Sequence, residues 1–316
     1  MITFINTTDI KITEKTAVVI GKFDGEHRGH RKLFRTLKKE ATERGLKTVV
    51  FSFRILPSNI VKNKHTTQIF TNVERRKKLE ELGIDYYIEY PFNMDIARLT
   101  GEEFLKDILI EKLGMAEIVA GDDAAFGYKK SGNIELLNRL SKEWGFDVKI
   151  ITKEKDDFQN DISSTLIRSK LDEGDMEEAN KLLGGVYSIS GVVEEGNKLG
   201  VKLGFPTLNI FPSSEKHLPK SGVYASRVRI GDDDTLYLGL TNVGSNPSIK
   251  DDKKDHIARV ETYLYNFDAT LYGREIEVYL YKYIRPEIKF ESLEALKSQI
   301  SKDKVEVLNF LNSHAN

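Results

Sequence analysis

Apolar and polar positions alternate in two different rhythms along the first half of the chain. Short apolar runs, typical of buried strands, occur at residues 17–20, 48–53, 86–88, 118–120 and 148–151. Between them, apolar positions three or four apart predict helices beginning close to His30 and at residues 73–82, 101–113 and 134–144. Because strands and helices alternate, we expect an α/β domain with a doubly wound, Rossmann-like parallel sheet.

The pattern changes near Gly184. Strand-like runs separated by glycine turns follow at residues 187–193, 222–230, 235–241, 258–265 and 275–284. These runs predict a small antiparallel β-barrel, closed by helices at residues 292–300 and 304–311. We therefore divide the chain into an N-terminal domain, residues 1–183, and a C-terminal domain, residues 184–316.

Composition narrows the class of protein. The chain has 316 residues, of which 40% are hydrophobic, so it can bury two cores. Lysine and arginine number 48 against 49 acidic residues, which gives no support for a nucleic-acid partner. The chain has no cysteine, which excludes disulfides and thiolate catalysis. No apolar run approaches the ~18 residues of a membrane span, and no leader pattern occurs, so we expect a cytoplasmic protein.

Two histidines, His27 and His30, lie in the turn between the first predicted strand and helix. They are three residues apart, so both can face one point at the helix N-terminus, where unpaired N–H groups favour phosphate. Gly29 lets a ligand approach the backbone closely. Imidazole donors at this point would stabilise charge that builds on a phosphate oxygen during transfer. Taken alone, the motif also fits two solvated histidines.

A second segment reads DISSTLIR, residues 161–168. Ser163 or Ser164 can cap a helix that begins there, which explains the hydroxyls but leaves Arg168 without a role. Hydroxyls and N–H groups at a helix start, with an arginine one turn later, would also bind a triphosphate.

The predicted barrel contains two candidate sites. A glycine-spaced basic loop runs from Gly196 into Pro-Thr-x-Asn, and its backbone N–H groups, with Lys198 and Lys202, could surround phosphates. Further along, Glu261 shares a strand face with Arg259 and Tyr263. Alone, the loop is a weak signal, and a strand carboxylate is more often simply solvated.

Taken together, these motifs resemble a known family. GKFDGEHRGH resembles the H-x-G-H nucleotidyltransferases and, at greater length, the prokaryotic bifunctional riboflavin kinase/FMN adenylyltransferases, or FAD synthetases. ISSTLIR, the G-x-x-x-G loop with PTLN, RVETYL and RPEIKF match further segments of that family, so the resemblance covers nearly the whole chain. Glu26 and Arg28 replace small or apolar residues, SFRILP lacks the histidine of F-x-P-H-P, and GDDAAFG has Ala124 in place of an aromatic residue. In the barrel, Leu208 replaces alanine and Val201-Lys202 replaces Gly-Arg.

The resemblance implies a role for each matching position. Catalytic roles fall to His27 and His30 in the first domain, and to Glu261 as general base in the barrel. Nucleotide binding falls to Gly21, Phe23, Gly29, Ser163, Ser164, Thr165 and Arg168, and in the barrel to Gly196, Lys198 and Gly204. Asp123 and Phe126, and in the barrel Arg285 and Phe290, would contact flavin. Thr207 and Asn209 would hold Mg²⁺.

The implied function is bifunctional flavin-cofactor synthesis. ATP would phosphorylate riboflavin to FMN in the C-terminal domain and adenylate FMN to FAD, with release of pyrophosphate, in the N-terminal domain. Two alternatives stay open: an FMN adenylyltransferase with a kinase-inactive barrel, and a flavin-binding regulatory protein. We expect small-molecule partners, namely ATP, riboflavin, FMN and FAD, and neither nucleic acid nor membrane. The sequence leaves the oligomeric state open.

Overall fold

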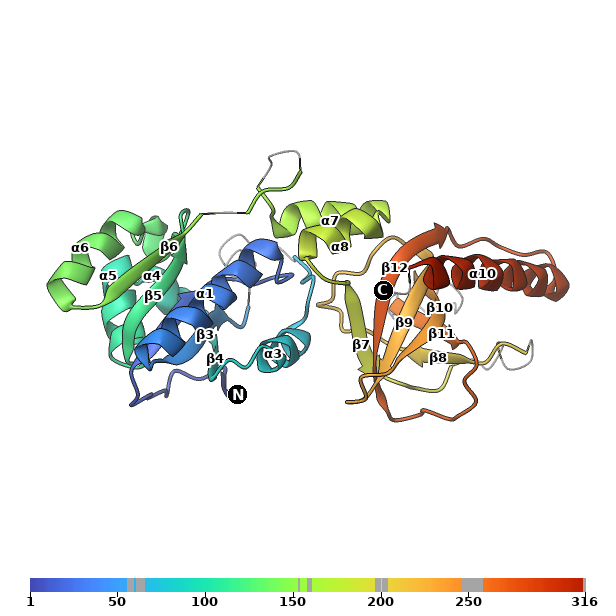
Figure 1. Ribbon diagram of the computed structural model, residues 1–316, viewed down its shortest axis with the longest axis horizontal. Coiled ribbons are helices and arrows are strands. Elements are labelled where there is room, and N and C mark those ends of the chain that lie inside the picture. The colour runs from blue at the N-terminus through green and yellow to red at the C-terminus, as the bar shows by residue number, and fades with distance from the viewer. Residues whose placement is uncertain are drawn as a thin grey trace. The chain divides into compact units, whose positions relative to one another are not determined.

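The computed structural model describes residues 1–55, 60, 66–152, 154–157, 161–196, 200, 204–245 and 258–314 (Figure 1). The chain packs into two compact units. The first comprises Met1–Thr66 and Thr71–Ser163, and the second comprises Thr67–Phe70 and Ser164–Asn316.

The first unit is built on a six-stranded parallel sheet. In spatial order, its strands are β1 (Ile2–Ile5), β4 (Tyr86–Tyr90), β3 (Lys47–Phe53), β2 (Thr16–Ile20), β5 (Met115–Gly121) and β6 (Asp147–Ile151). The central strand β2 is fully buried on both faces, as Ala17, Val18 and Val19 show, which is why it reads as a continuous apolar run. The predicted parallel sheet is confirmed, while β1, an edge strand with exposed ends, was not predicted.

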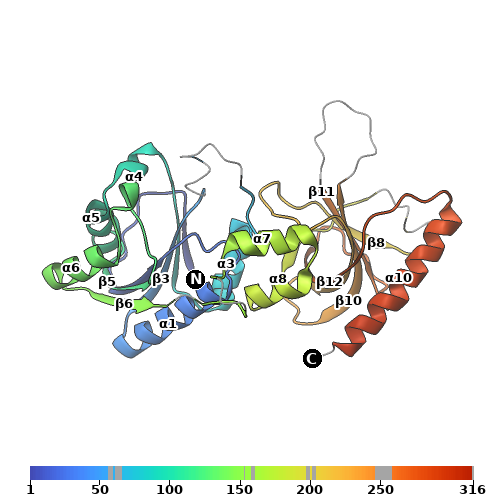
Figure 2. The ribbon, with the colours of Figure 1, turned by 90° about the horizontal axis from the view of Figure 1, so that it is seen from above.

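Helices cover both faces of this sheet. On one face, Phe34 and Leu37 of α1 (Arg28–Arg44) and Leu79 of α3 (Asn72–Glu81) pack together. On the other face lie η1 (Phe104–Ile110), a π-helix that continues α5 (Gly101–Glu103), and α6 (Ile134–Trp144). The short helices α4 (Met94–Arg98) and η2 (Tyr128–Lys130) complete the unit. Figure 2 shows α1 and α6 on opposite sides of the strands. The doubly wound arrangement is therefore confirmed.

Besides Thr67–Phe70, the second unit contains α7 (Ser164–Glu173) and α8 (Met176–Leu183), followed by a curled antiparallel sheet. Its spatial order is β7 (Ser188–Val192), β12 (Glu275–Arg285), β9 (Gly222–Ile230), β10 (Leu236–Ser245), β11 (Ala258–Leu264) and β8 (Thr207–Ile210). Just beyond β7, the N–H of Glu194 donates to the carbonyl of Asn209 at 2.9 Å, so the two edge strands approach each other. The predicted small barrel is confirmed. The domain boundary predicted at residues 183/184 remains a prediction. In the structure, α7 and α8 pack in the same unit as the antiparallel sheet.

In the barrel, one local prediction was wrong and one strand was missed. The strand β8 was not predicted, because its four residues follow a proline and resemble a loop. The two helices predicted at residues 292–300 and 304–311 are one helix, α10 (Leu293–Ser313), which lies along the outer face of the sheet (Figures 1 and 2). Neither glycine nor proline interrupts residues 293–313, so the helix continues through the polar residues in its middle. One of these, Asp303, is buried and paired with Arg285 of β12.

A row of buried hydroxyls crosses the interior of the curled sheet. Thr241 of β10 is hydrogen-bonded to Ser226 of β9 at 2.7 Å and to Thr262 of β11 at 2.8 Å. All three residues are at most 1% exposed, so each hydroxyl depends on its neighbour for hydrogen bonding.

Thr241→Val is expected to lower the free energy of unfolding by about 1–3 kcal/mol, because the two remaining hydroxyls lose a buried partner. Urea unfolding measures this change. Thr235→Val, at an exposed position, serves as the matched control and is expected to change the free energy by less than about 0.5 kcal/mol. Equal effects of the two substitutions would contradict the buried row.

Candidate active sites

The turn after β2 lies where the order of strands reverses. From β2 the chain moves outward through β3 and β4, and then returns to place β5 on the other side of β2. In open α/β sheets, ligands bind beyond the carboxyl ends of the strands at such a switch point. His27 is the N-cap residue of α1 and His30 lies in its first turn. The turn therefore presents both imidazoles at the predicted place.

Close packing fixes the two imidazole rings. The rings of His27 and His30 stack, with centroids 3.7 Å apart and planes 25° from parallel. The Phe23 ring meets His30 edge-on at 5.2 Å and is itself buried. A Cβ at Gly21 would lie 2.6 Å from that phenyl ring, so only glycine fits there. Gly21 and Phe23 therefore support the His30 ring by packing, while their nucleotide-binding roles remain predictions.

Burial keeps both imidazoles uncharged. It lowers the pKa of His27 to about 4. Burial also lowers the pKa of His30 well below its usual value, and the nearby His27 and Arg75 lower it further. At neutral pH, both side chains are therefore neutral hydrogen-bonding groups rather than cations.

Glu26 is an unexpected feature of this turn. Its side chain is 3% exposed, and its backbone has a φ of 41°, in the left-handed region. Burial raises the pKa of Glu26 to about 7. The sequence identified Glu26 as a departure from the family pattern but gave no sign that the carboxyl group is buried.

The predicted phosphate-binding residues fall in both units. Ser163 ends the first unit, while Ser164, Thr165 and Arg168 lie in the first two turns of α7, in the second unit. Arg168 Nε donates to the carbonyl of Thr67 at 3.1 Å. In the first unit, a Cβ at Gly29 would lie 3.2 Å from the His27 ring, so little space separates backbone and imidazole. That ISSTLIR shares one cavity with the two histidines remains a prediction.

The two predicted flavin contacts in the loop at residues 121–127 have different environments. Asp123 is exposed. Phe126 turns inward, where its ring packs 5.9 Å from that of Phe104 and fits against Gly132. Their flavin-binding roles remain predictions. Pro57, the last residue of the SFRILP segment, lies outside the described residues.

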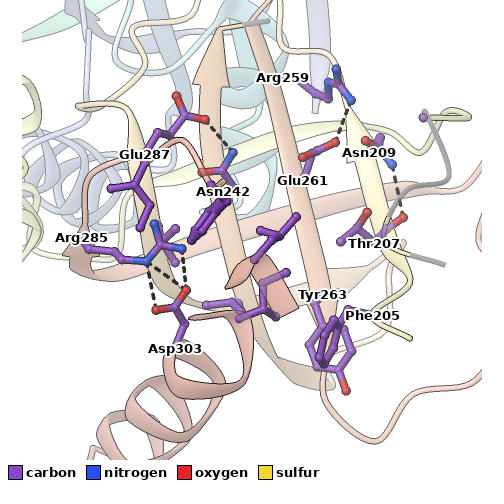
Figure 3. Close-up of a pocket in the computed structure, with 18 of the residues that line it drawn as sticks. Phe205, Thr207, Asn209, Asn242, Arg259, Glu261, Tyr263, Arg285, Glu287 and Asp303 are labelled. Atoms are coloured by element: carbon purple, nitrogen blue, oxygen red, sulfur yellow. Dashed lines mark hydrogen bonds and ion pairs between the residues drawn. The ribbon is translucent and has the colours of Figure 1, made fainter. Parts of the chain in front are cut away.

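In the second unit, a cavity of about 410 Å³ is lined by most of the predicted barrel residues, though not by Gly204 (Figure 3). The predicted residues in its lining are Gly196, Thr207, Asn209, Glu261, Arg285 and Phe290. Strand register creates its polar row: Asn209 of β8 and Asn242 of β10 both lie opposite Glu261 of β11. Two residues along, Thr207 pairs with Tyr263. Because side chains alternate along a strand, these groups share one face and the buried hydroxyl row lies on the other.

Asn209 is well placed to bind a ligand. Its side chain is 5% exposed, and its Oδ1 atom is buried with no hydrogen-bond partner among the described residues. A Cβ at Gly196 would lie 2.5 Å from the Asn209 amide nitrogen, so the backbone at Gly196 lies directly against this side chain. Gly204 has a φ of 83°, as expected for a glycine turn. Lys198 and the Val201-Lys202 step lie outside the described residues.

Arg259 orients Glu261. Its Nη1 atom donates to Glu261 Oε1 at 2.7 Å, and the carboxylate side chain is 34% exposed toward the cavity. The pairing confirms that Arg259, Glu261 and Tyr263 share a strand face, because Val260 and Thr262 point inward and are buried.

Further polar groups line the cavity from its other side. Arg285 is clamped by Asp303 of α10, with Nε 3.0 Å from both carboxylate oxygens, and its guanidinium lies 6.0 Å from the Phe290 ring. Asn242 Nδ2 donates to Glu287 Oε1 at 2.9 Å. Sequence reasoning missed Glu287 and Asp303 as lining residues; the RPEIKF match was the only signal for Glu287.

Comparisons with known proteins cover both units. The FAD synthetase family matches residues 9–166 and the riboflavin kinase family matches residues 183–311. A bifunctional riboflavin kinase/FMN adenylyltransferase from Buchnera aphidicola is 40% identical over 96% of each chain. The protein of that description from Escherichia coli is 35% identical over 94% of this chain and 93% of its own. A crystal structure from Streptococcus pneumoniae, described as a macrolide-efflux protein, is 32% identical over 98% of each chain, with a TM-score of 0.84.

The two folds and their matches define a two-domain transferase that uses a nucleotide. The chain belongs to the bifunctional riboflavin kinase/FMN adenylyltransferase family, as its motifs predicted. It is an enzyme of flavin synthesis whose substrates are ATP, riboflavin and FMN. Within the described ranges, no helix is long and apolar enough to span a membrane.

We expect both imidazoles of the turn to stay neutral at pH 6, where a solvated histidine with a pKa of about 6.5 is mostly charged. NMR of ¹⁵N-histidine-labelled protein, assigned with His27→Asn and His30→Asn variants, measures this. Since unfolded His27 binds a proton more readily than folded His27, its burial weakens folding as pH falls from about 6.5 toward 4. Titration of either ring near pH 6.5 would contradict the burial argument.

Proposed function

We propose that the 410 Å³ cavity of the second unit is where riboflavin is phosphorylated. The observation that carries the proposal is the row of Asn209, Glu261 and Asn242 across three paired strands. Glu261, oriented by Arg259, takes the proton from the ribityl 5′-hydroxyl as that oxygen attacks the γ-phosphate of ATP. Such a base must be both fixed and accessible, and a partly exposed carboxylate held by one arginine is both.

Thr207 and Asn209 are proposed to hold Mg²⁺ in that cavity. The hydroxyl and amide oxygens suit this cation, and the buried Asn209 Oδ1 atom, which has no hydrogen-bond partner in the described part of the chain, fits a metal ligand. When bound, the metal would neutralise negative charge on the ATP phosphates. Gly196, with Lys198 and Gly204, forms the loop proposed to pass over those phosphates, because a glycine backbone can approach them closely.

FMN adenylation is proposed at the imidazole turn of the first unit. There the FMN phosphate attacks the α-phosphorus of ATP in line, and pyrophosphate leaves. Neutral His27 and His30 stabilise the transition state by donating hydrogen bonds. Ser163, Ser164, Thr165 and Arg168 are proposed to bind the leaving pyrophosphate, because a helix start and a guanidinium both favour anions.

The flavin contacts are proposed as the resemblance implied. Phe290 and Arg285 lie at one wall of the cavity, where Asp303 holds the guanidinium still. In the first unit, Asp123 and Phe126 are proposed to contact the flavin; Asp123 is exposed, and the Phe126 ring also packs near that of Phe104. We also propose that the enzyme works in the cytoplasm, where its substrates are soluble small molecules.

The intact kinase cavity favours two activities over the alternatives. An adenylyltransferase with an inactive barrel has no need for an oriented base beside an unpartnered amide oxygen. A flavin-binding regulator needs neither this base nor the stacked imidazoles.

Separate substitutions should divide the two activities. His30→Ala is expected to lower FAD formation by about 10²–10³-fold, because a transition-state donor is lost, while FMN formation survives. Glu261→Gln is expected to lower FMN formation from riboflavin by about 10²–10⁴-fold, because the base is lost, while adenylation of supplied FMN survives. Chromatography of riboflavin, FMN and FAD over time measures both. Parallel loss of the two activities in a folded variant would contradict the assignment.

A further inference from the structure

A four-residue strap, Thr67–Phe70, packs in the second unit although the chain on either side of it belongs to the first. The N–H of Gln68 donates to the carbonyl of Glu215 at 2.7 Å, and the N–H of His217 donates back to the carbonyl of Gln68 at 2.6 Å. Ile69 and Phe70 are at most 4% exposed. The strap is therefore held in the second unit by an isolated β-bridge between Gln68 and Lys216 and by two buried side chains.

Lys216 holds the middle of the strap. Its ammonium group donates to the carbonyl of Ile69 at 2.8 Å and to the carbonyl of Ser188 at 2.6 Å. It also lies 4.8 Å from the centre of the Phe70 ring and 4.6 Å from that of Tyr187. Lys216 is 5% exposed. A buried ammonium needs such partners, so its position and that of the strap depend on each other.

The first residue of the strap reaches α7. The carbonyl of Thr67 accepts from Arg168 Nε at 3.1 Å, and its hydroxyl lies 2.7 Å from His217 Nδ1. On its other side, His217 Nε2 lies 3.1 Å from Asp172, one turn beyond Arg168. Thr67 and His217 thus contact the same face of α7 at two successive turns.

We propose that the strap is a positioning element for pyrophosphate binding, in which the Thr67 carbonyl fixes the plane of the Arg168 guanidinium. This inference rests on the proposed role of Arg168. A guanidinium binds phosphate through a rigid, planar set of donors, so fixing one of them restricts how the others are presented. Arg168 contacts the leaving group, whereas Thr67, Lys216 and His217 act through it.

The strap also continues directly into the first unit. Thr71, the next residue, caps α3 through a capping box with Glu74, and Arg75 of α3 is one of the charges that act on His30. A short run of chain therefore joins the anchor of Arg168 to the helix that influences the catalytic imidazole.

The test is a double-mutant cycle in which the KM for pyrophosphate is measured. Lys216→Met removes the ammonium group that binds the Ile69 carbonyl. Thr67→Val removes the hydroxyl contact with His217 while it keeps the side-chain shape. Each is made alone and combined with Arg168→Ala in the full-length enzyme. The measured quantities are KM for pyrophosphate in the reverse reaction, FAD to FMN and ATP, and KM for ATP in the forward reaction.

We expect Lys216→Met to raise both KM values about tenfold and Thr67→Val to raise them several-fold, with FMN formation from riboflavin within twofold. Neither should add to the effect of Arg168→Ala, because both act through that side chain. Lys220→Met is the matched control: Lys220 lies in the same loop over the Tyr283 ring, 5.1 Å from its centre, and its substitution should leave both KM values unchanged.

Two outcomes separate failure of the inference from failure of the function. If Arg168→Ala leaves KM for pyrophosphate unchanged, the proposed role of Arg168 is wrong. If Arg168→Ala raises it while both strap variants leave it unchanged, or add fully to it, the strap does not position Arg168. The conservative Thr67→Val variant keeps the test decisive should Lys216→Met fail to fold.

Discussion

The register between β8, β11 and β10 is the constraint on which the proposed kinase site depends. Asn209, Glu261 and Asn242 are far apart in sequence, and backbone pairing alone places them in one row. Because strand side chains alternate, a slip of one residue would turn Glu261 into the barrel interior. The interior prevents this slip: Val260 and Thr262 are fully buried, and Thr262 takes part in the hydroxyl row. The polar row and the core beneath it therefore specify the same pairing.

In the first unit, the proposed site is formed by residues that are close together in the sequence. The imidazoles lie in one turn, where Gly21 makes room for the Phe23 ring and that ring supports His30. The packing that positions the rings also removes their charge, since burial disfavours the protonated form. One site is thus assembled by long-range strand pairing and the other by close packing within ten residues. The two units have separate hydrophobic cores, which is consistent with two activities in one chain.

Sequence reasoning predicted the parts of this structure that local pattern determines. The parallel sheet, the barrel and the pair of histidines follow from apolar periodicity and short motifs. Features that depend on distant partners were missed: β8 is recognisable only beside β11, and the strap beside Lys216. The division of 292–311 into two helices failed because a buried Asp303 looks like a surface residue until Arg285 is placed against it. The burial of Glu26 had no local signal at all.

A crystal structure with ADP, Mg²⁺ and FMN tests the central claim most directly. If the register builds the kinase site, the metal should lie about 2.0–2.1 Å from Asn209 Oδ1. Glu261 should then lie within hydrogen-bond reach, about 2.6–3.2 Å, of the ribityl 5′ oxygen. A nucleotide and metal bound elsewhere on the second unit, with the row of Asn209, Glu261 and Asn242 untouched, would contradict it.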